Sequence, residues 1–498
     1  MNLAHNIVAN YASHIYVTLI GIVTVPLYIT YMGAEAYGLV GYFAMLQAWF
    51  NILDMGITPT MVRETARFHG GATDAFGYRE FVRALEGLFL FVALMGGGAL
   101  FTTAGYIAHD WLQRTDLLAE SVETALQIMA VIVALRWMCG LYRGVISGSE
   151  HLVWLGGFNA FIATIRFVGV FVVLIFIGVT PAIFFSYQLG VALLEFSGLL
   201  FYATRLMPPI PKDKRLSWSW KPIKPVFRFS LTIAFTSSVW VLVKQTDQLI
   251  LSKLLPLTEY GTFTLATLVA SGITLMAAPV SSAIIPRMTH LEATGDGAGF
   301  IRVYRQSTQW ISIIAGAASI TVAFCAEPLL WAWTGNRVLA HHAAPILILY
   351  AIGNGVVAVS AFPYYLQYAK GDLRLDFIAN LVYLLFLIPA MIWAANQYGA
   401  MGTGYVWMGL SLFSFIAWPP FVYRKFIPEI ILKWYGVDIL IIVLTAAMVG
   451  YCLSYFLPNS DSRVWQMGIV IGFGLIVMLS GAMASTFVRT RWREMWSV

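Results

Sequence analysis

The sequence predicts an all-α, polytopic membrane protein with about 14 transmembrane helices, arranged as two pseudo-symmetric six-helix bundles plus a C-terminal helix pair. Of its 498 residues, 59% are hydrophobic and 11% are charged, and the mean hydropathy is +0.77. A soluble domain carries about 25% charged residues. Apolar runs of about 20 residues, enough to cross a bilayer, recur from end to end. This composition excludes a soluble protein with a single anchor.

An internal repeat supports the arrangement in two bundles. A tight turn at residues 32–38 separates the first two apolar runs, and a similar turn at 257–261 opens a later one. Three residue pairs share one separation of 223 positions: Gly38 with Gly261, Gly148 with Gly371, and Arg79 with Arg302. Because duplicated units are common in secondary transporters, we expect the chain to carry the same helical unit twice.

The transmembrane spans follow from the apolar runs and from the polar segments between them. In the first half, a charged loop with Arg67, a polar segment at 109–114 and a Gly–Pro hinge at 178–181 separate neighbouring runs. The predicted spans are 6–30, 37–62, 81–108, 120–146, 154–177, 181–205, 226–254, 260–286, 304–326, 343–369, 375–396, 400–423, 434–456 and 464–488.

These spans divide the chain into four predicted segments. The N-terminal six-helix bundle covers residues 1–207, the C-terminal six-helix bundle covers 226–424, and an additional transmembrane helix pair covers 425–498. The connector 208–225 contains several prolines and so does not form a single helix. Its lysines and tryptophans suit the cytoplasmic membrane interface. It therefore reads as a basic cytoplasmic linker.

The basic residues predict the orientation in the membrane. One set of loops and termini, to which Arg143 and Arg305 are assigned, holds 23 Lys and Arg residues, and the opposite set holds 4. Cytoplasmic loops are the ones enriched in Lys and Arg, so both termini are expected in the cytoplasm. The same imbalance accounts for the net charge of +6 without any need for nucleic acid as a partner.

Five charged residues near the middle of predicted spans are the main candidates for function: Arg136, Arg166, Lys244, Glu195 and Asp247. A charge at such a depth costs about 2.5–3.5 kcal/mol on insertion scales, so these groups are expected to line a polar interior. Arg166 and Glu195 lie about equally far from the hinge at 178–181, and Lys244 and Asp247 are one helical turn apart. Either couple serves as a structural pair or binds cargo. Arg136 has no obvious partner in the sequence.

Other candidate residues carry weaker signals. Asp54 lies toward the cytoplasmic end of its predicted span and either caps a helix, pairs with a neighbour or takes part in coupling. The cysteines Cys139, Cys325 and Cys452 are scattered in apolar runs and have no metal-ligand spacing. No nucleotide-binding loop, metal cluster or nucleophile motif is present. We therefore expect no enzyme activity, no metal and no cofactor, apart from possible coupling to Na⁺ or H⁺.

The residues Met32-Gly-Ala-Glu-Ala-Tyr-Gly38, followed by Leu53-Asp-Met-Gly56 and Arg63, resemble the opening of the oligosaccharide flippases, the Wzx-type polysaccharide transporters. Their superfamily also contains multidrug/toxin extruders and lipid II flippases. The resemblance implies translocation of an undecaprenyl-diphosphate-linked oligosaccharide from the cytoplasmic to the periplasmic leaflet for O-antigen, capsule or exopolysaccharide synthesis. It implies a multi-pass protein of the bacterial inner membrane that works by alternating access, with membrane lipids and polysaccharide polymerase machinery as partners.

The charged residues lead to a hypothesis about the site of that transport. Guanidinium groups match phosphate oxygens, so Arg136 and Arg166, with Lys244 from the second bundle, are expected to bind the diphosphate. Asp247, Glu195 and Asp54 remain for coupling or for ion pairs. The alternative is a cation-coupled multidrug extruder of the same fold. An envelope glycosyltransferase or ligase would need a large loop with acidic catalytic residues, and the predicted periplasmic loops are short.

Overall fold

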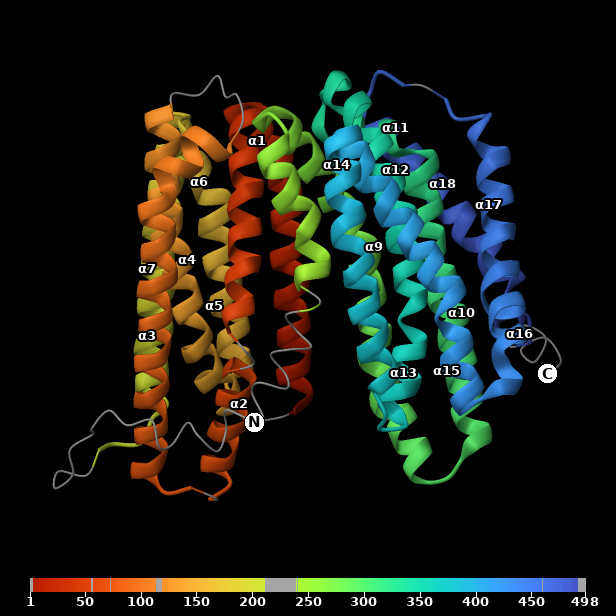
Figure 1. The fold of residues 1–498 in the computed structure, drawn as a ribbon, viewed down its shortest axis with the longest axis horizontal. Coiled ribbons are helices and arrows are strands. Elements are labelled where there is room, and N and C mark those ends of the chain that lie inside the picture. Colours follow the sequence, from red (N-terminus) through yellow and green to blue (C-terminus); the bar gives the residue numbers. More distant parts are fainter. Residues whose placement is uncertain are drawn as a thin grey trace. The chain divides into compact units, whose positions relative to one another are not determined.

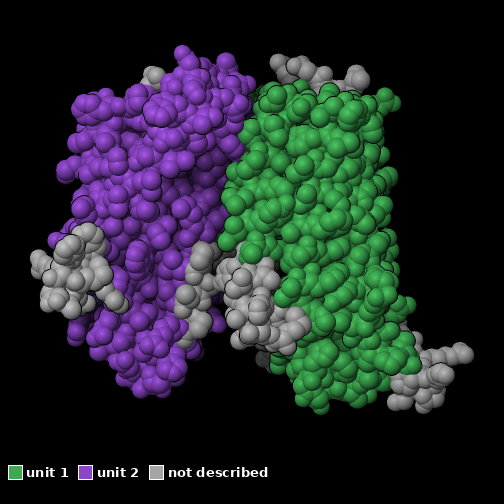
Figure 2. Space-filling model, turned by 180° about the vertical axis from the view of Figure 1, so that it is seen from behind, with its two compact units in different colours: residues 1–261 green, residues 262–498 purple. Residues whose placement is uncertain are grey.

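The computed structural model describes residues 3–54, 57–71, 73–112, 119–210, 239, 241–458 and 460–490. The structure is 91% helix, and no strand occurs in these residues, which confirms the all-α prediction. The chain forms two compact units, Met1–Gly261 and Thr262–Val498 (Figure 2). Within each unit the long helices run side by side (Figure 1).

Unit 1 is built from the helices of the first predicted bundle, together with the segment 239–261. The helix α9 begins at the end of unit 1 and continues into unit 2. The helices are α1 (Leu3–Leu53), α2 (Ile57–His69), α3 (Ala75–Tyr106), η1 (Ile107–Trp111), α4 (Ala119–Gly148), α5 (Leu152–Thr164), η2 (Ile165–Gly169), α6 (Val170–Phe176), α7 (Pro181–Leu206) and α9 (Leu257–Ala293). Residues 241–254 are also helical.

The turn predicted at residues 32–38 is a sharp break in α1. Gly33 leaves the helical conformation with φ 85° and ψ 163°, a region that glycine enters without steric penalty. Its counterpart 223 positions later, Pro256, lies between the helix 241–254 and α9. Gly38 and Gly261, which share the same separation of 223 positions, are in contact, because a Cβ atom on Gly261 would lie 3.1 Å from the Gly38 nitrogen. The repeat therefore places two glycines where helix backbones meet.

The second predicted span, 37–62, does not run as one helix. α1 ends at Leu53, and Asp54 starts the separate helix α2 by accepting hydrogen bonds from the Thr58 hydroxyl at 2.6 Å and the Thr58 N–H at 3.3 Å. Capping by a carboxylate stabilises a helix start. Ala277, the counterpart of Asp54, has no such side chain, and α9 continues through it. The capping interpretation of Asp54 is confirmed.

A stripe of glycines packs α4 against α2. Gly140, Gly144 and Gly148 recur every four residues and so lie on one face of α4. A Cβ atom on Gly144 would lie 2.9 Å from the Met61 Cβ, and one on Gly148 would lie 2.5 Å from the Val62 carbonyl oxygen. Small residues let helix backbones approach closely in a membrane protein, so this stripe fixes the position of α2.

Unit 2 contains the second set of helices and the C-terminal pair. They are α10 (Gly297–Phe324), α11 (Ala326–Thr334), α12 (Arg337–Ser360), α13 (Phe362–Ala369), α14 (Arg374–Ala417), α15 (Pro419–Phe426), η3 (Pro428–Ile430), α16 (Ile431–Lys433), η4 (Trp434–Leu440), α17 (Ile441–Ser454) and α18 (Arg463–Ala484), with the rest of α9. The extra pair α17 and α18 packs on α10 through a buried apolar cluster that includes Ile320, Ala446 and Phe473.

Helix caps give a second measure of the repeat. Asp74 caps α3 by accepting from the Gly77 N–H, and Asp296 caps α10 by accepting from the Gly299 N–H. These two caps are 222 positions apart. At these helix starts the two repeat units are therefore offset by 222 positions, one fewer than the 223 positions that separate the residue pairs in the sequence. By helix position, Arg302 therefore corresponds to Glu80 rather than to Arg79.

Two loops end with charged contacts. In the loop between α13 and α14, Asp372 accepts a hydrogen bond at 2.5 Å from Lys425 of α15, which lowers the pKa of that carboxyl. Arg463, the first residue of α18, donates hydrogen bonds to the carbonyl oxygens of Ala332 and Trp333 at the C-terminal end of α11. A cation at a helix C-terminus complements the helix dipole.

Eleven helical stretches among the described residues are long and apolar enough to cross a membrane. Two of them, Ala12–Asn51 with 40 residues and Arg374–Phe426 with 53 residues, each contain a break, at Gly33 and at Gly399. The predicted span 226–254 falls partly outside the described residues, as do residues 211–225 of the linker. The count of fourteen spans and the four segment boundaries remain predictions.

Candidate functional site

Arg166 lies in a π-helical turn, η2, that interrupts the span between α5 and α6. A π turn shifts the backbone hydrogen-bond pattern and often marks a functional position. Side chains compensate for this shift. The Tyr187 hydroxyl donates to the Ile165 carbonyl at 2.8 Å, and the Gln188 amide donates to the Arg166 carbonyl at 3.2 Å. The Tyr28 hydroxyl donates to the next carbonyl at 3.1 Å. The turn that positions Arg166 is thus held from two neighbouring helices.

Arg136 and Arg143 both come from α4. They are seven residues apart, which places them two turns apart on one helix face. Arg136 donates from Nη1 to the Gln47 side-chain oxygen at 2.8 Å and stacks over the Phe43 ring at 5.2 Å. Arg143 donates to the Asn159 side-chain oxygen at 2.7 Å. The expectation that Arg136 has no partner was wrong, because α1 supplies both an acceptor and an aromatic face.

Glu195 on α7 joins these three arginines. Its carboxylate oxygens are 2.5 Å from Arg143 Nη2 and 2.5 Å from Arg166 Nη2, and 4.0 Å from Arg136 Nε. The predicted pairing of Arg166 with Glu195 is confirmed. One carboxylate thus faces three guanidinium groups, and its side chain is only 5% exposed. The arginine cluster, defined as Arg136, Arg143, Arg166 and Glu195, carries an excess of positive charge.

The arginine cluster keeps unused hydrogen-bonding capacity. The Nε atoms of Arg136 and Arg166 are buried, and neither has an acceptor among the described residues. Buried donors are satisfied in more than about 90% of cases, so each unsatisfied donor needs an explanation. The arginine side chains are 12%, 21% and 32% exposed for Arg136, Arg166 and Arg143. The cluster is therefore partly accessible from outside the helix packing.

The remaining predicted site residues lie elsewhere in unit 1. Lys244 and Asp247 are in the helix 241–254, and Asp247 acts electrostatically on Lys244. The Asp247 carboxylate also accepts from the Gln248 N–H at 2.7 Å and is 5% exposed. Asp54 has the capping role described above. Lys244 was expected from the second bundle, whereas its helix groups with Arg136 and Arg166 in unit 1.

Sequence reasoning missed one charged member of the arginine cluster and several polar side chains that surround the cluster. Arg143 was counted as a cytoplasmic loop residue, although its spacing of seven from Arg136 was a usable signal. Gln47, Gln188 and Asn159 are amides inside apolar runs, and the sequence does not show which of them face an arginine. The π turn at Arg166 leaves no mark in the sequence.

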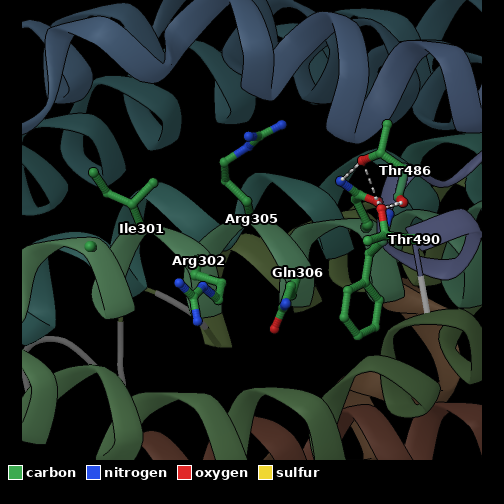
Figure 3. Close-up of a pocket in the computed structure, with 9 residues that line it drawn as sticks. Ile301, Arg302, Arg305, Gln306, Thr486 and Thr490 are labelled. Atoms are coloured by element: carbon green, nitrogen blue, oxygen red, sulfur yellow. Dashed lines mark hydrogen bonds between the residues drawn. The ribbon is translucent and has the colours of Figure 1, made fainter. Parts of the chain in front are cut away.

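Unit 2 has a buried ion pair that was not predicted. Arg305 on α10 donates from Nε and Nη2 to Asp438 of η4 at 2.7 and 2.9 Å, and Asp438 is fully buried. Gln309 donates to the same carboxylate at 2.6 Å. Arg305 and Gln309 also line a cavity of about 700 Å³ at the start of α10 (Figure 3). None of the predicted site residues is among the described residues that line this cavity.

Comparisons with known proteins agree with this fold. Residues 3–292 match the family model described as "Polysaccharide biosynthesis protein". The structure of the lipid II flippase MurJ in an inward closed conformation has a TM-score of 0.71 and 13% identity, covering 96% of this chain and 97% of that one. No curated protein matches the chain.

Two transporters of the MATE family are also similar. One is an inward-facing multidrug resistance transporter of the MOP superfamily, with a TM-score of 0.64 and 12% identity over 82% of this chain and 95% of that one. The other is a mutant of the Vibrio cholerae transporter VcmN, with a TM-score of 0.52 and 13% identity over 87% and 99%. At these identities the likeness concerns the fold alone.

Proposed function

The chain belongs to the polysaccharide biosynthesis protein family, and from this premise we propose that it is a flippase for a lipid-linked oligosaccharide carried on undecaprenyl diphosphate. The single observation that carries this proposal is the arginine cluster, in which three guanidinium groups share one carboxylate. The excess positive charge suits an anionic cargo. Transfer of a bare diphosphate through about 30 Å of hydrocarbon is prohibitive unless fixed cations offset its charge.

Arg136 is the member of the cluster that binds cargo first. Its Nε is 4.0 Å from Glu195, whereas the other two arginines are held at 2.5 Å. The planar guanidinium is already oriented by Gln47 and Phe43, so little side-chain freedom is lost when a phosphate oxygen arrives. Arg166 follows by turning its unsatisfied Nε toward the second phosphate. Glu195 holds the arginines together when no cargo is bound.

The other charged residues take supporting roles in this proposal. Lys244 provides a further cation for the diphosphate as it moves, and its neighbour Asp247 holds the lysine between cycles. A buried carboxylate such as Asp247 is also the position at which a coupling Na⁺ or H⁺ would act. The cargo passes from the cytoplasmic to the periplasmic leaflet of the inner membrane by alternating access, where polysaccharide polymerase machinery takes it over.

The proposal is tested in the organism that carries the gene. Arg136→Gln at native expression is expected to abolish surface polysaccharide and to leave the lipid-linked oligosaccharide in the cytoplasmic leaflet. Arg136→Lys is expected to be partly active, because it keeps the charge and loses the planar fork. The matched control is Arg83→Gln, since Arg83 lies in the same unit, is 59% exposed and pairs with Glu86 one turn away.

Normal polysaccharide from Arg136→Gln, with the variant present in the membrane at wild-type amount, contradicts the proposal. Loss of polysaccharide together with loss of the protein assigns Arg136 a structural role instead. The multidrug extruder remains the alternative, because two similar structures are MATE transporters. Efflux of a cationic dye by the wild-type protein, abolished by Asp247→Asn, would favour that alternative.

A further inference from the structure

The cavity at the start of α10 has the features of a second, independent binding site. It is lined by two arginines, by amide and hydroxyl side chains and by one aromatic ring. The lining residues are Ala298, Ile301, Arg302, Arg305, Gln306, Gln309, Thr486, Phe487 and Thr490. They come from the first turns of α10 and from the segment that follows α18, so they lie within unit 2. From them we infer that this cavity binds the headgroup of an anionic phospholipid.

A hydrogen-bond network around Gln309 forms the back wall of the cavity. The Gln309 side-chain oxygen accepts hydrogen bonds from the Ser485 hydroxyl at 2.5 Å and the Phe487 N–H at 3.2 Å. Its amide nitrogen donates to Thr486 at 2.9 Å and to Asp438. This buried network ties the segment after α18 to α10. A headgroup therefore meets a wall whose geometry is set before binding, which lowers the entropy cost of binding.

The charge in the cavity favours an anion. Arg305 is neutralised by Asp438, to which it donates from Nε and Nη2. Arg302 is exposed and forms no ion pair with any described residue. Figure 3 shows Arg302 and Gln306 extending to the same side of α10, as their spacing of four residues requires. A guanidinium and an amide N–H can thus bind one phosphate together.

The surroundings of the cavity favour an amphiphile over a free phosphate. The Phe487 ring packs edge-on against the Trp310 ring, with 6.2 Å between centroids. Trp310 lies two turns beyond Arg302, about 12 Å further along α10. On the neighbouring α18, Leu479 and Met483 are 59% and 72% exposed. The cationic end of the cavity therefore continues into an aromatic and then an apolar surface, on which acyl chains can lie.

The predicted orientation places this cavity on the cytoplasmic side, where anionic lipids attract basic segments. An anionic headgroup bound in this cavity would contact both α10 and the segment after α18, and so would hold the two together. The proposed lipid site does not depend on the flippase proposal, since it uses no residue of the arginine cluster.

Native mass spectrometry of the purified full-length protein tests this inference. Phosphatidylglycerol and phosphatidylcholine with identical chains are compared as probes. We expect the wild-type protein to retain phosphatidylglycerol preferentially, and Arg302→Gln to weaken this binding about tenfold. Arg424→Gln, an exposed arginine of the same unit outside the cavity, is the matched control and should bind like the wild type.

Competition experiments distinguish the possible ligands. Millimolar inorganic phosphate is not expected to displace the lipid, and undecaprenyl diphosphate is not expected to compete at Arg302. Equal retention of the two phospholipids, or unchanged binding by Arg302→Gln, overturns the inference. Displacement by inorganic phosphate or by undecaprenyl diphosphate also overturns it, in favour of a simple anion site or a cargo site. Crosslinking of phosphatidylglycerol by a photoreactive residue at Phe487 would support it independently.

Discussion

Replacing Glu195 by Gln removes the carboxylate that faces the three guanidinium groups of the arginine cluster. Glutamine keeps the shape of the side chain, so no cavity forms and the change is almost purely electrostatic. Glu195 is 5% exposed and makes two ion pairs at 2.5 Å. Removing one partner from a buried ion pair costs about 3–5 kcal/mol, because the remaining charge is left uncompensated. We expect Glu195→Gln to lower the free energy of unfolding by that amount.

Single arginine substitutions are expected to cost less. Arg143→Gln leaves Glu195 paired with Arg166, and Arg136→Gln removes the most distant member at 4.0 Å. Each should cost about 1.5–3 kcal/mol, the range for a hydrogen bond to a charged group. The double variant Glu195→Gln/Arg143→Gln should be more stable than the sum of its single effects predicts, because it also removes one of the repelling cations.

The assay is thermal unfolding of the detergent-purified protein, followed by tryptophan fluorescence. The expected order of stability is wild type, then Arg136→Gln, then Arg143→Gln, then Glu195→Gln. A Glu195→Gln variant as stable as the wild type would refute the reasoning. So would a double variant whose loss equals the sum of the two single losses, since this would mean that the charges do not interact.

Three further predictions concern other parts of the structure. Gly148→Val should destabilise the protein by about 1–3 kcal/mol through overpacking against α2, measured by the same unfolding assay, whereas Gly157→Val should not, because nothing lies within 4 Å of an added Cβ there. Cysteines placed at Thr294 and Asp461 in a background without native cysteines should react with membrane-impermeant reagents from opposite sides, and labelling of both from one side would contradict the predicted topology. The contact with Lys425 lowers the pKa of Asp372, so it stabilises the loop above the unfolded pKa of about 4 and is lost as the pH falls through the lower folded value. Hydrogen-exchange protection of residues 370–373, measured relative to the intrinsic exchange rate at each pH, should fall in that range. Protection that stays constant with pH would count against the contact.

Much of the fold could be predicted from the sequence because a membrane restricts backbone structure to a few solutions. Long apolar runs must be helices, and the glycine at position 33 sits in a turn that the sequence identified. The predicted divisions between spans 6–30 and 37–62 and between spans 375–396 and 400–423 are confirmed, because the chain leaves the helical conformation at Gly33 and Gly399. The end of α1 at Leu53 follows from a cap whose hydrogen bonds only the structure reveals.

The candidate site was predicted in part. The pairing of Arg166 with Glu195 followed from their similar distances to the hinge at 178–181, because antiparallel neighbouring helices bring such residues to the same depth. The third arginine was missed because Arg143 lies near a helix end, where a basic residue normally marks a cytoplasmic loop. The buried pair of Arg305 and Asp438 was missed for the same reason. Positions near the ends of helices carry little information about which side chains turn inward.

Binding of undecaprenyl diphosphate to the purified protein tests the central claim most directly. We predict that the wild-type protein binds this lipid and does not bind undecaprenol, which lacks the phosphates. Arg136→Gln and Arg166→Gln should each weaken binding by about tenfold or more, since each removes a charge-assisted contact of at least 1.4 kcal/mol. The control Arg83→Gln should bind like the wild type. Equal affinity of the wild type and both cluster variants would contradict the claim that the arginine cluster binds the diphosphate.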